Sequence, residues 1–265
     1  MERIDLRGVV LYECRTSRSL AVRSRPAIEG AHLSPVPQPP HPAPSRVGLT
    51  DSVQASLIAA FAGATAEDEP YRHWLVYRVF PDGFSQVLRN LPFEAPALGG
   101  LSGKRELHND QRHYFDAANA ARFDACAAVA AAFQSAEVTA AIAAATGADL
   151  AGSYVRLEYA QDTDGFWLEP HTDLGVKLFT MLIYLPEPAG QADLGTDLYH
   201  DQATWARRTP YDDNSALVFV PGSDTWHGLD PRTIHGVRRS VIMNYVTDQW
   251  RAREQLAYPD IPVRV

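Results

Sequence analysis

The stretch at residues 167–185, "WLEPHTDLGVKLFTMLIYL", places two possible metal ligands directly before a long apolar run. His171 and Asp173 are two positions apart, so on an extended segment both side chains leave the same face of the chain. Residues 177–185 have the length and the β-branched and aromatic content of a buried strand. Taken alone, such a pair is more often a hydrogen-bonded turn than a metal site, so the rest of the sequence must decide between the two.

The chain after residue 153 contains more strands of this kind. Three further segments are rich in β-branched and aromatic residues and are separated by Gly, Asp and Pro turns: 153–160, 215–222 and 239–247. This part of the sequence therefore predicts an antiparallel, mainly β structure.

The chain before residue 150 has mainly helical patterns. Residues 49–63 predict a helix with Thr50 or Asp51 as its N-cap, and 84–91 predict a short helix. The alanine-rich segment 117–146 predicts two helices that break near residues 134–135 and end at residue 147. A strand is expected at 71–80.

Helices followed by strands indicate an α+β fold, mainly β, in which a helical layer supports a barrel or sandwich. Residues 35–44, "PVPQPPHPAP", hold six of the nineteen prolines and favour extended, unpaired backbone. We therefore expect a poorly ordered Arg/Pro-rich arm and linker at 1–46 and a single domain at 47–265. Its helical support would span about 47–150 and its β core about 151–250.

Composition restricts the compartment and the partners. The net charge is −8, which argues against nucleic acid or an anionic membrane as the main partner. The two cysteines, Cys14 and Cys126, form neither a disulfide pattern nor a zinc motif. We expect a cytoplasmic protein, and the oligomeric state is not predicted.

The metal interpretation of His171 and Asp173 requires a second histidine. One His and one carboxylate on a shared face supply two of the three ligands in the facial triad that binds non-haem Fe(II). His227, which follows a strand and a Pro-Gly turn, is favoured over His235. His108 and Asp110 form a rival pair, but they precede helices rather than a strand.

A candidate for binding an organic acid lies eleven residues after His227. On a strand, Arg238 and Ser240 share a face and Arg239 points the other way. A guanidinium group can hold a carboxylate through two parallel hydrogen bonds, and a neighbouring hydroxyl adds a neutral donor.

With His171-Thr-Asp173, His227 and Arg238-Arg-Ser240 in this order, the chain resembles the Fe(II)- and 2-oxoglutarate-dependent dioxygenases. The strand "FTMLIYL" is similar to that of the prolyl-hydroxylase-like branch. The resemblance implies a double-stranded β-helix, a jelly roll of the cupin kind, with Fe(II) bound by His171, Asp173 and His227.

The same resemblance implies how the cosubstrate binds. Arg238, Ser240 and Tyr184 would hold 2-oxoglutarate, and Tyr159 would lie near the iron. The expected cofactors are Fe(II), 2-oxoglutarate and O2, with ascorbate as a possible stimulant. The implied reaction hydroxylates an unactivated C–H bond and releases succinate and CO2.

The substrate is expected to meet the first barrel strand and the loop before the alanine-rich helices. The candidate residues are Tyr154 or Arg156 on the strand and Arg105 and Arg112 in the loop. Lys104, Arg105 and Arg112 could clamp an anionic group, such as the carboxylate of an amino acid. A solvated charged loop is the alternative for Arg105 and Arg112. A small metabolite, such as an amino acid, is the favoured substrate; the alternatives are a hydroxylase of protein side chains and a cupin-like sensor without turnover.

Overall fold

The computed structural model describes residues 45–105, 111–173, 175–187 and 190–265. These residues belong to one compact unit, Ala43–Val265. The arm predicted at 1–46 lies outside them except for its last two residues, and so do His108 and Asp110 of the rival metal pair.

Five α-helices are described, and all of them precede the long strands of the barrel. They are α1 (Arg46–Ala62), α2 (Phe84–Arg89), α3 (Ala117–Arg122), α4 (Asp124–Gln134) and α5 (Ala136–Thr146). The predicted cap of α1 was wrong, because Ser45 accepts the Gly48 amide and starts the helix earlier. The alanine-rich segment forms three helices instead of two. The predicted break is correct, since Ser135 caps α5, and Gly147 ends α5 at a positive φ of 77°.

The strands form two antiparallel sheets. The seven-stranded sheet has the order β1-β2-β9-β6-β11-β4-β3, with β1 (Thr65–Glu67), β2 (His73–Tyr77), β3 (His113–Tyr114), β4 (Tyr154–Asp162), β6 (Lys177–Tyr184), β9 (Ser215–Phe219) and β11 (Arg238–Val246). The four-stranded sheet has the order β5-β10-β7-β8, with β5 (Leu168–His171), β7 (Asp197–Tyr199), β8 (Trp205–Arg208) and β10 (His227–Leu229). A short 3-10 helix, η2 (Arg253–Gln255), follows β11.

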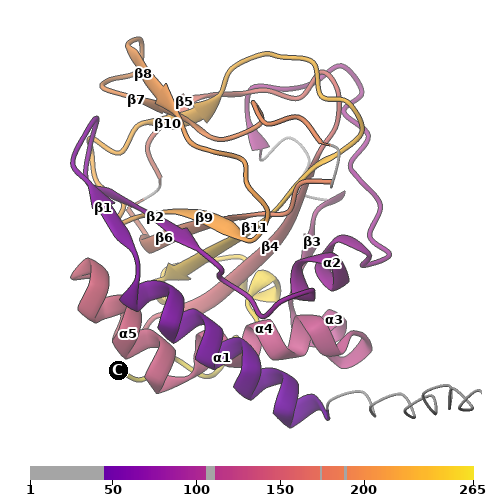
Figure 1. Ribbon diagram of the computed structural model, residues 1–265, viewed down its shortest axis with the longest axis vertical. Helices are drawn as coiled ribbons and strands as arrows, with labels where there is room; N and C mark the ends of the chain where they lie inside the picture. The colour runs from indigo at the N-terminus through magenta and orange to yellow at the C-terminus, as the bar shows by residue number, and fades with distance from the viewer. Residues whose placement is uncertain (1–44, 106–110, 174, 188–189) are drawn as a thin grey trace, which may run out of the picture. The chain divides into compact units, whose positions relative to one another are not determined.

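Two cores lie on opposite faces of the seven-stranded sheet. The odd-numbered apolar residues of β4, β6 and β11, such as Leu157, Met181 and Met243, pack with the helices. The even-numbered Leu182 of β6 packs instead with Leu198 and other residues of the four-stranded sheet. Figure 1 shows the helices gathered against one face of the larger sheet and β5, β7, β8 and β10 on the other side. The expected α+β fold, a double-stranded β-helix supported by helices, is confirmed.

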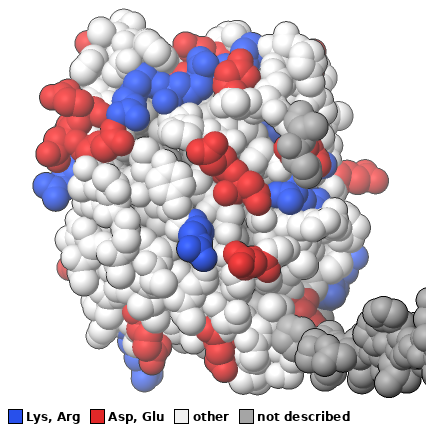
Figure 2. All heavy atoms as spheres, viewed as in Figure 1, with Lys and Arg blue, Asp and Glu red and all other residues white. Residues whose placement is uncertain are grey.

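Basic and acidic side chains lie close together in parts of the molecule. The face drawn in Figure 2 is mostly uncharged, and basic groups in its upper part lie among acidic ones. In the smaller sheet, Arg208 pairs with Asp197 at 2.8 Å, and Arg207 pairs with Glu67 of β1. Within the described part of the chain no single helix is long and apolar enough to cross a membrane, although the bent pair α4 and α5 passes that test together by length and composition.

Candidate active site

Strand pairing in the smaller sheet brings the two predicted histidines together. His171 at the end of β5 is the register partner of His227 at the start of β10, and the centroids of their rings are 4.4 Å apart. With Asp173, they offer three ligand atoms within 4.8 Å of one another. His235 is exposed and lies outside this group. The structure thus brings together the three residues that the sequence favoured.

Both imidazoles are oriented by the backbone. Nδ1 of His171 lies 2.8 Å from the Glu169 carbonyl oxygen, and Nδ1 of His227 lies 3.0 Å from that of Thr225. A carbonyl can only accept, so each Nδ1 carries a proton, and in a neutral ring Nε2 is then the nitrogen with the lone pair for a metal. Burial, and then the neighbouring His171, lower the pKa of His227 to about 4, so His227 is neutral at physiological pH.

Asp173 is held as a carboxylate by two residues that the sequence analysis did not identify. Lys177 donates to its Oδ1 and Thr180 to its Oδ2, each at 2.5 Å. Burial alone would raise the pKa of Asp173, but the charges of Lys177 and His227 and these hydrogen bonds outweigh it and hold the pKa well below its usual range. Lys177 and Thr180 follow Asp173 by four and seven residues. That spacing is visible in the sequence, but the contacts depend on the path of the chain from Asp173 into β6, which the sequence does not show.

The predicted cosubstrate residues lie deeper in the barrel. Arg238 is 2 % exposed and lines the cavity; its Nε donates to the Leu194 carbonyl and its Nη1 to Asp162 at 2.7 Å. Arg105 shares the Asp162 carboxylate, so two arginines face one acid. Nη2 of Arg238 has no hydrogen-bond partner among the described residues. This corner therefore has one uncompensated positive charge and a donor for an organic acid.

Ser240 and Tyr184 lie next to Arg238, in register across β11 and β6. The Ser240 hydroxyl is fully buried and has no hydrogen-bond partner among the described residues, although Ser240 itself does not line the cavity as Arg238 does. The Tyr184 hydroxyl is already bonded to the hydroxyls of Thr196 and Thr209, both at 2.8 Å. Tyr184 therefore supports this end of the barrel and is not a free donor to the cosubstrate.

The prediction that Tyr159 lies near the iron is wrong. Its side chain points to the helical face of β4, where its hydroxyl donates to the Leu88 carbonyl at 2.9 Å. Only even-numbered residues of β4 face the barrel, so Glu158 occupies the inner position next to it. The error is one of strand phase. Glu158 and Tyr159 are adjacent in "RLEYA" and point to opposite faces of the strand, and the sequence alone does not show which of the two faces the barrel.

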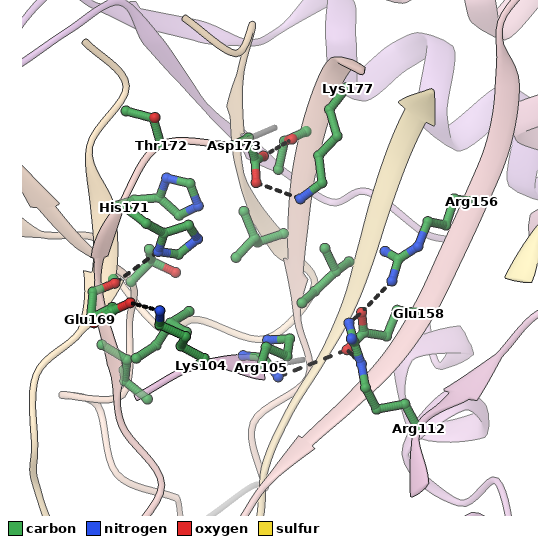
Figure 3. A pocket seen from close by; sticks show the side chains of 18 of the residues that line it. Lys104, Arg105, Arg112, Arg156, Glu158, Glu169, His171, Thr172, Asp173 and Lys177 are labelled. Atoms are coloured by element: carbon green, nitrogen blue, oxygen red, sulfur yellow. Dashed lines mark hydrogen bonds and ion pairs between the residues drawn. The ribbon is translucent and has the colours of Figure 1, made fainter. Parts of the chain in front are cut away.

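Three of the four predicted substrate residues line one cavity of about 430 Å³: Arg105, Arg112 and Arg156. Tyr154 does not line it, because its ring stacks under Arg253 at 4.1 Å at the end of the strand. Arg105 and Arg112 are bound to Asp162 and Glu158, which contradicts a solvated loop for both. Figure 3 shows Arg112 and Arg156 converging on Glu158, with the cavity between them and His171. Trp250 and Gln255, which follow β11, also line the cavity and were not predicted.

The residues of this cavity fit the metal and the cosubstrate that the resemblance implies. Two imidazoles and one carboxylate form the donor set of the facial triad and leave further coordination positions for other ligands. Nη2 of Arg238 is a donor for a carboxylate in the cavity, and the unpartnered Ser240 hydroxyl is buried two residues along the same strand. This fit concerns the described residues alone.

No family model and no curated protein matches the chain. Solved structures do match it. A prolyl-4-hydroxylase from Pseudomonas putida is 15 % identical, with a TM-score of 0.47, over 74 % of this chain and 92 % of its own. A prolyl hydroxylase from Trichoplax adhaerens is 14 % identical, with a TM-score of 0.49, over 77 % and 93 %. HygX from Streptomyces hygroscopicus, solved with nickel and 2-oxoglutarate bound, is 15 % identical, with a TM-score of 0.43, over 73 % and 90 %.

At these identities the chemistry of the site rests on the chain's own residues. The chain has the double-stranded β-helix and the His-Asp-His cluster that the resemblance to Fe(II)- and 2-oxoglutarate-dependent dioxygenases implies.

Proposed function

We propose that the protein is an Fe(II)- and 2-oxoglutarate-dependent oxygenase that hydroxylates a C–H bond of a small metabolite. The observation that carries this proposal is the cluster of His171, Asp173 and His227, in which both histidines donate from Nδ1 to backbone carbonyls and so leave Nε2 as the ligand atom. In the overall reaction, the substrate, O2 and 2-oxoglutarate give the hydroxylated product, succinate and CO2.

Each part of the cavity has a task in this reaction. His171, Asp173 and His227 would hold the iron, while Lys177 and Thr180 fix the carboxylate of Asp173. Arg238 and Ser240 would bind the distal carboxylate of 2-oxoglutarate and so aim its 2-oxo acid end at the metal. When bound, iron and 2-oxoglutarate supply the activation of O2 that no side chain can provide. The cavity also has an apolar lining, which would limit the access of water to the reacting groups. It includes Leu182, Leu229 and Ile242.

A small substrate is favoured over a protein side chain by the size of the cavity. Its volume of about 430 Å³ must hold both the cosubstrate and the substrate, and it lies near the lower end of the range for small-molecule sites. A protein hydroxylase of the prolyl type remains the second candidate, since Thr180 and Tyr184 match the strand on which that likeness rests. A sensor without turnover is the third.

Anaerobic addition of Fe(II) and 2-oxoglutarate tests the proposal. A chelated 2-oxo acid gives a weak visible charge-transfer band, which we expect for the wild-type protein. His171→Ala and His227→Ala should abolish the band, because each removes one of three ligands. His235→Ala is the matched control, since this exposed histidine is near in sequence to His227 but outside the cluster. A wild-type protein without the band would rule out the dioxygenase function.

Turnover separates an enzyme from a sensor. Succinate release in air should rise above its background when a panel of small metabolites is added, and mass spectrometry of a responding mixture should show a product 16 mass units heavier, the mass of one added oxygen atom. A protein that shows the band yet releases no succinate with any metabolite or peptide would be assigned to the sensor class.

A further inference from the structure

The wall of the cavity that faces His171 is unusually rich in cations. Six basic side chains line the cavity: Lys104, Arg105, Arg112, Arg156, Lys177 and Arg238. Only three acidic ones do so among the described residues, namely Glu158, Glu169 and Asp173. Asp162 lies behind Arg105 and Arg238 as a fourth. The described cavity thus has more positive than negative side chains before any metal is added.

Arg156 is the most rigidly held of these cations. It is 3 % exposed and lies between the rings of Tyr114 and Trp250, 5.1 and 4.9 Å from their centroids. Its Nε donates to Gln255 at 3.0 Å, its Nη1 to Asn244 at 3.1 Å and its Nη2 to Glu158 at 3.0 Å. Nη2 also donates to the Tyr114 hydroxyl at 3.5 Å. A guanidinium group has five N–H bonds, so these contacts fix its plane and leave one N–H of Nη1 for a ligand.

Glu158 does not turn this wall into a cation site. Its Oε2 accepts from Arg112 and Arg156, and its Oε1 accepts from Arg112 at 2.8 Å. The carboxylate is 1 % exposed, so its lone pairs serve arginines and not a ligand. The wall therefore offers donors and positive charge, and it would repel an ammonium group.

The distance from Arg156 to the metal ligands limits the length of a molecule that could contact both. Arg156, Asn244 and Thr180 are register partners on the neighbouring strands β4, β11 and β6. Strands lie about 4.8 Å apart, so about 10 Å separates the backbone of Arg156 from that of Thr180, whose hydroxyl bonds Asp173. The hydrogen bonds run the same way: Arg156 donates to Asn244, Asn244 to Thr180 and Thr180 to Asp173.

We infer that the substrate is a small anion whose carboxylate or phosphate binds at Arg156 beside Trp250. Arg238 is left for 2-oxoglutarate, so the two anions occupy separate arginines. The C–H bond to be oxidised then lies only a few bonds from the anionic group. This inference rests on the proposed function for its chemistry, but the anion site itself is a property of the cavity and can be tested without turnover.

Calorimetric titration with four phenyl compounds tests which ligand charge the cavity prefers. Benzoate, phenyl phosphate, benzamide and benzamidine share a ring that suits the apolar wall and Trp250, and they differ in charge. They are titrated into protein loaded with Fe(II) and 2-oxoglutarate without oxygen, and again into metal-free protein. We expect benzoate or phenyl phosphate to bind at least about tenfold more tightly than benzamide, because a charge-assisted contact is stronger than a neutral one. Which of the two binds identifies a carboxylate or a phosphate site.

Variants locate the site. Arg156→Gln should reduce the affinity for the anionic probe to that for benzamide and leave the 2-oxoglutarate titration of the charge-transfer band unchanged. Arg238→Gln should do the reverse. Arg122→Gln is the matched control, because Arg122 also stacks on a ring, that of Phe123 at 5.0 Å, but does not line the cavity. If Arg156→Gln does not fold, Arg156→Lys should show a smaller loss, since it keeps the charge without the planar fork.

Several outcomes would overturn the inference. Tighter binding of benzamidine than of benzoate and phenyl phosphate, or equal binding of all four probes, would contradict an anion site. Weaker 2-oxoglutarate binding in Arg156→Gln but not in Arg238→Gln would assign Arg156 to the cosubstrate. A wild-type protein that binds the anions but shows no charge-transfer band would refute the proposed function and leave the anion site standing.

Discussion

Neighbouring residues on the central strands of the larger sheet face two different environments. On β6, Phe179 packs against Phe61 and Tyr245 in the helical core, whereas the next residue, Thr180, donates to Asp173. On β4, Tyr159 contacts the helices and Glu158 binds arginines in the cavity. The outer face holds the sheet to its helical support and the inner face carries the polar groups of the site, so a side chain's task follows from its phase on the strand.

The difference in chemistry between the faces has a thermodynamic meaning. Burial of apolar area stabilises the outer face, and this hydrophobic contribution does not depend on the orientation of the contacting groups. The inner face buries charged and polar groups, which is tolerated where they have hydrogen-bond partners, as Arg156 has in Glu158 and Asn244. We therefore expect outer substitutions to change the free energy of unfolding and inner ones to change ligand affinity.

The largest expected effect comes from Phe179→Ala on the outer face. Phe179 is fully buried, and loss of such a ring costs about 3–5 kcal/mol through lost transfer energy and the remaining cavity. Chemical denaturation should show this loss, while the dissociation constant for Fe(II) of the folded protein stays close to that of the wild type.

Thr180→Val is the matched substitution one residue away. It keeps the shape of the side chain but removes the hydrogen bond to Asp173, so the affinity for Fe(II) should fall by about 10- to 100-fold. If Phe179→Ala weakened Fe(II) binding as much as Thr180→Val does, the two faces would not be separable in this way.

The next effect concerns pH and the inner histidine His227. Its pKa is about 4 in the folded protein and 6.5 as a free side chain, so the unfolded chain takes up a proton first as the pH falls. The contribution of His227 to the unfolding free energy of the metal-free protein should therefore be complete above pH 6.5 and should decrease as the pH falls from 6.5 to 4. A shift of this size corresponds to about 3 kcal/mol.

Comparison with a variant isolates this contribution. In His227→Gln the part of the pH dependence between 6.5 and 4 that is due to this side chain should disappear, whereas His235→Gln should retain it because His235 is exposed. Equal pH profiles for the wild type and His227→Gln, measured by urea unfolding, would contradict a neutral buried histidine.

The sequence was sufficient for the long strands and the metal ligands but not for the rest of the inner face. His171 and Asp173 were found because a period of two on an extended segment is visible in any sequence. The strands β5, β7, β8 and β10 have only three or four residues each, too few for an alternation pattern. Glu158 and Asn244 were missed because their partners, Arg112 and Thr180, are distant in sequence and meet them only through strand pairing.

The smallest expected effect tests the phase of β4 at Tyr159. Tyr159→Phe removes the hydroxyl that donates to the Leu88 carbonyl, and loss of one such hydrogen bond costs about 0.5–1.5 kcal/mol of stability. The affinity for 2-oxoglutarate, titrated through the charge-transfer band, should not change, because the side chain faces the helices. Ser240→Ala offers the comparison on the inner face: its hydroxyl has no partner within the described part of the chain, so its loss should weaken 2-oxoglutarate binding with little effect on unfolding. If Tyr159→Phe weakened cosubstrate binding more than Ser240→Ala, the tyrosine would have to reach the cavity after all, and the division of the sheet into a structural and a functional face would fail at this strand.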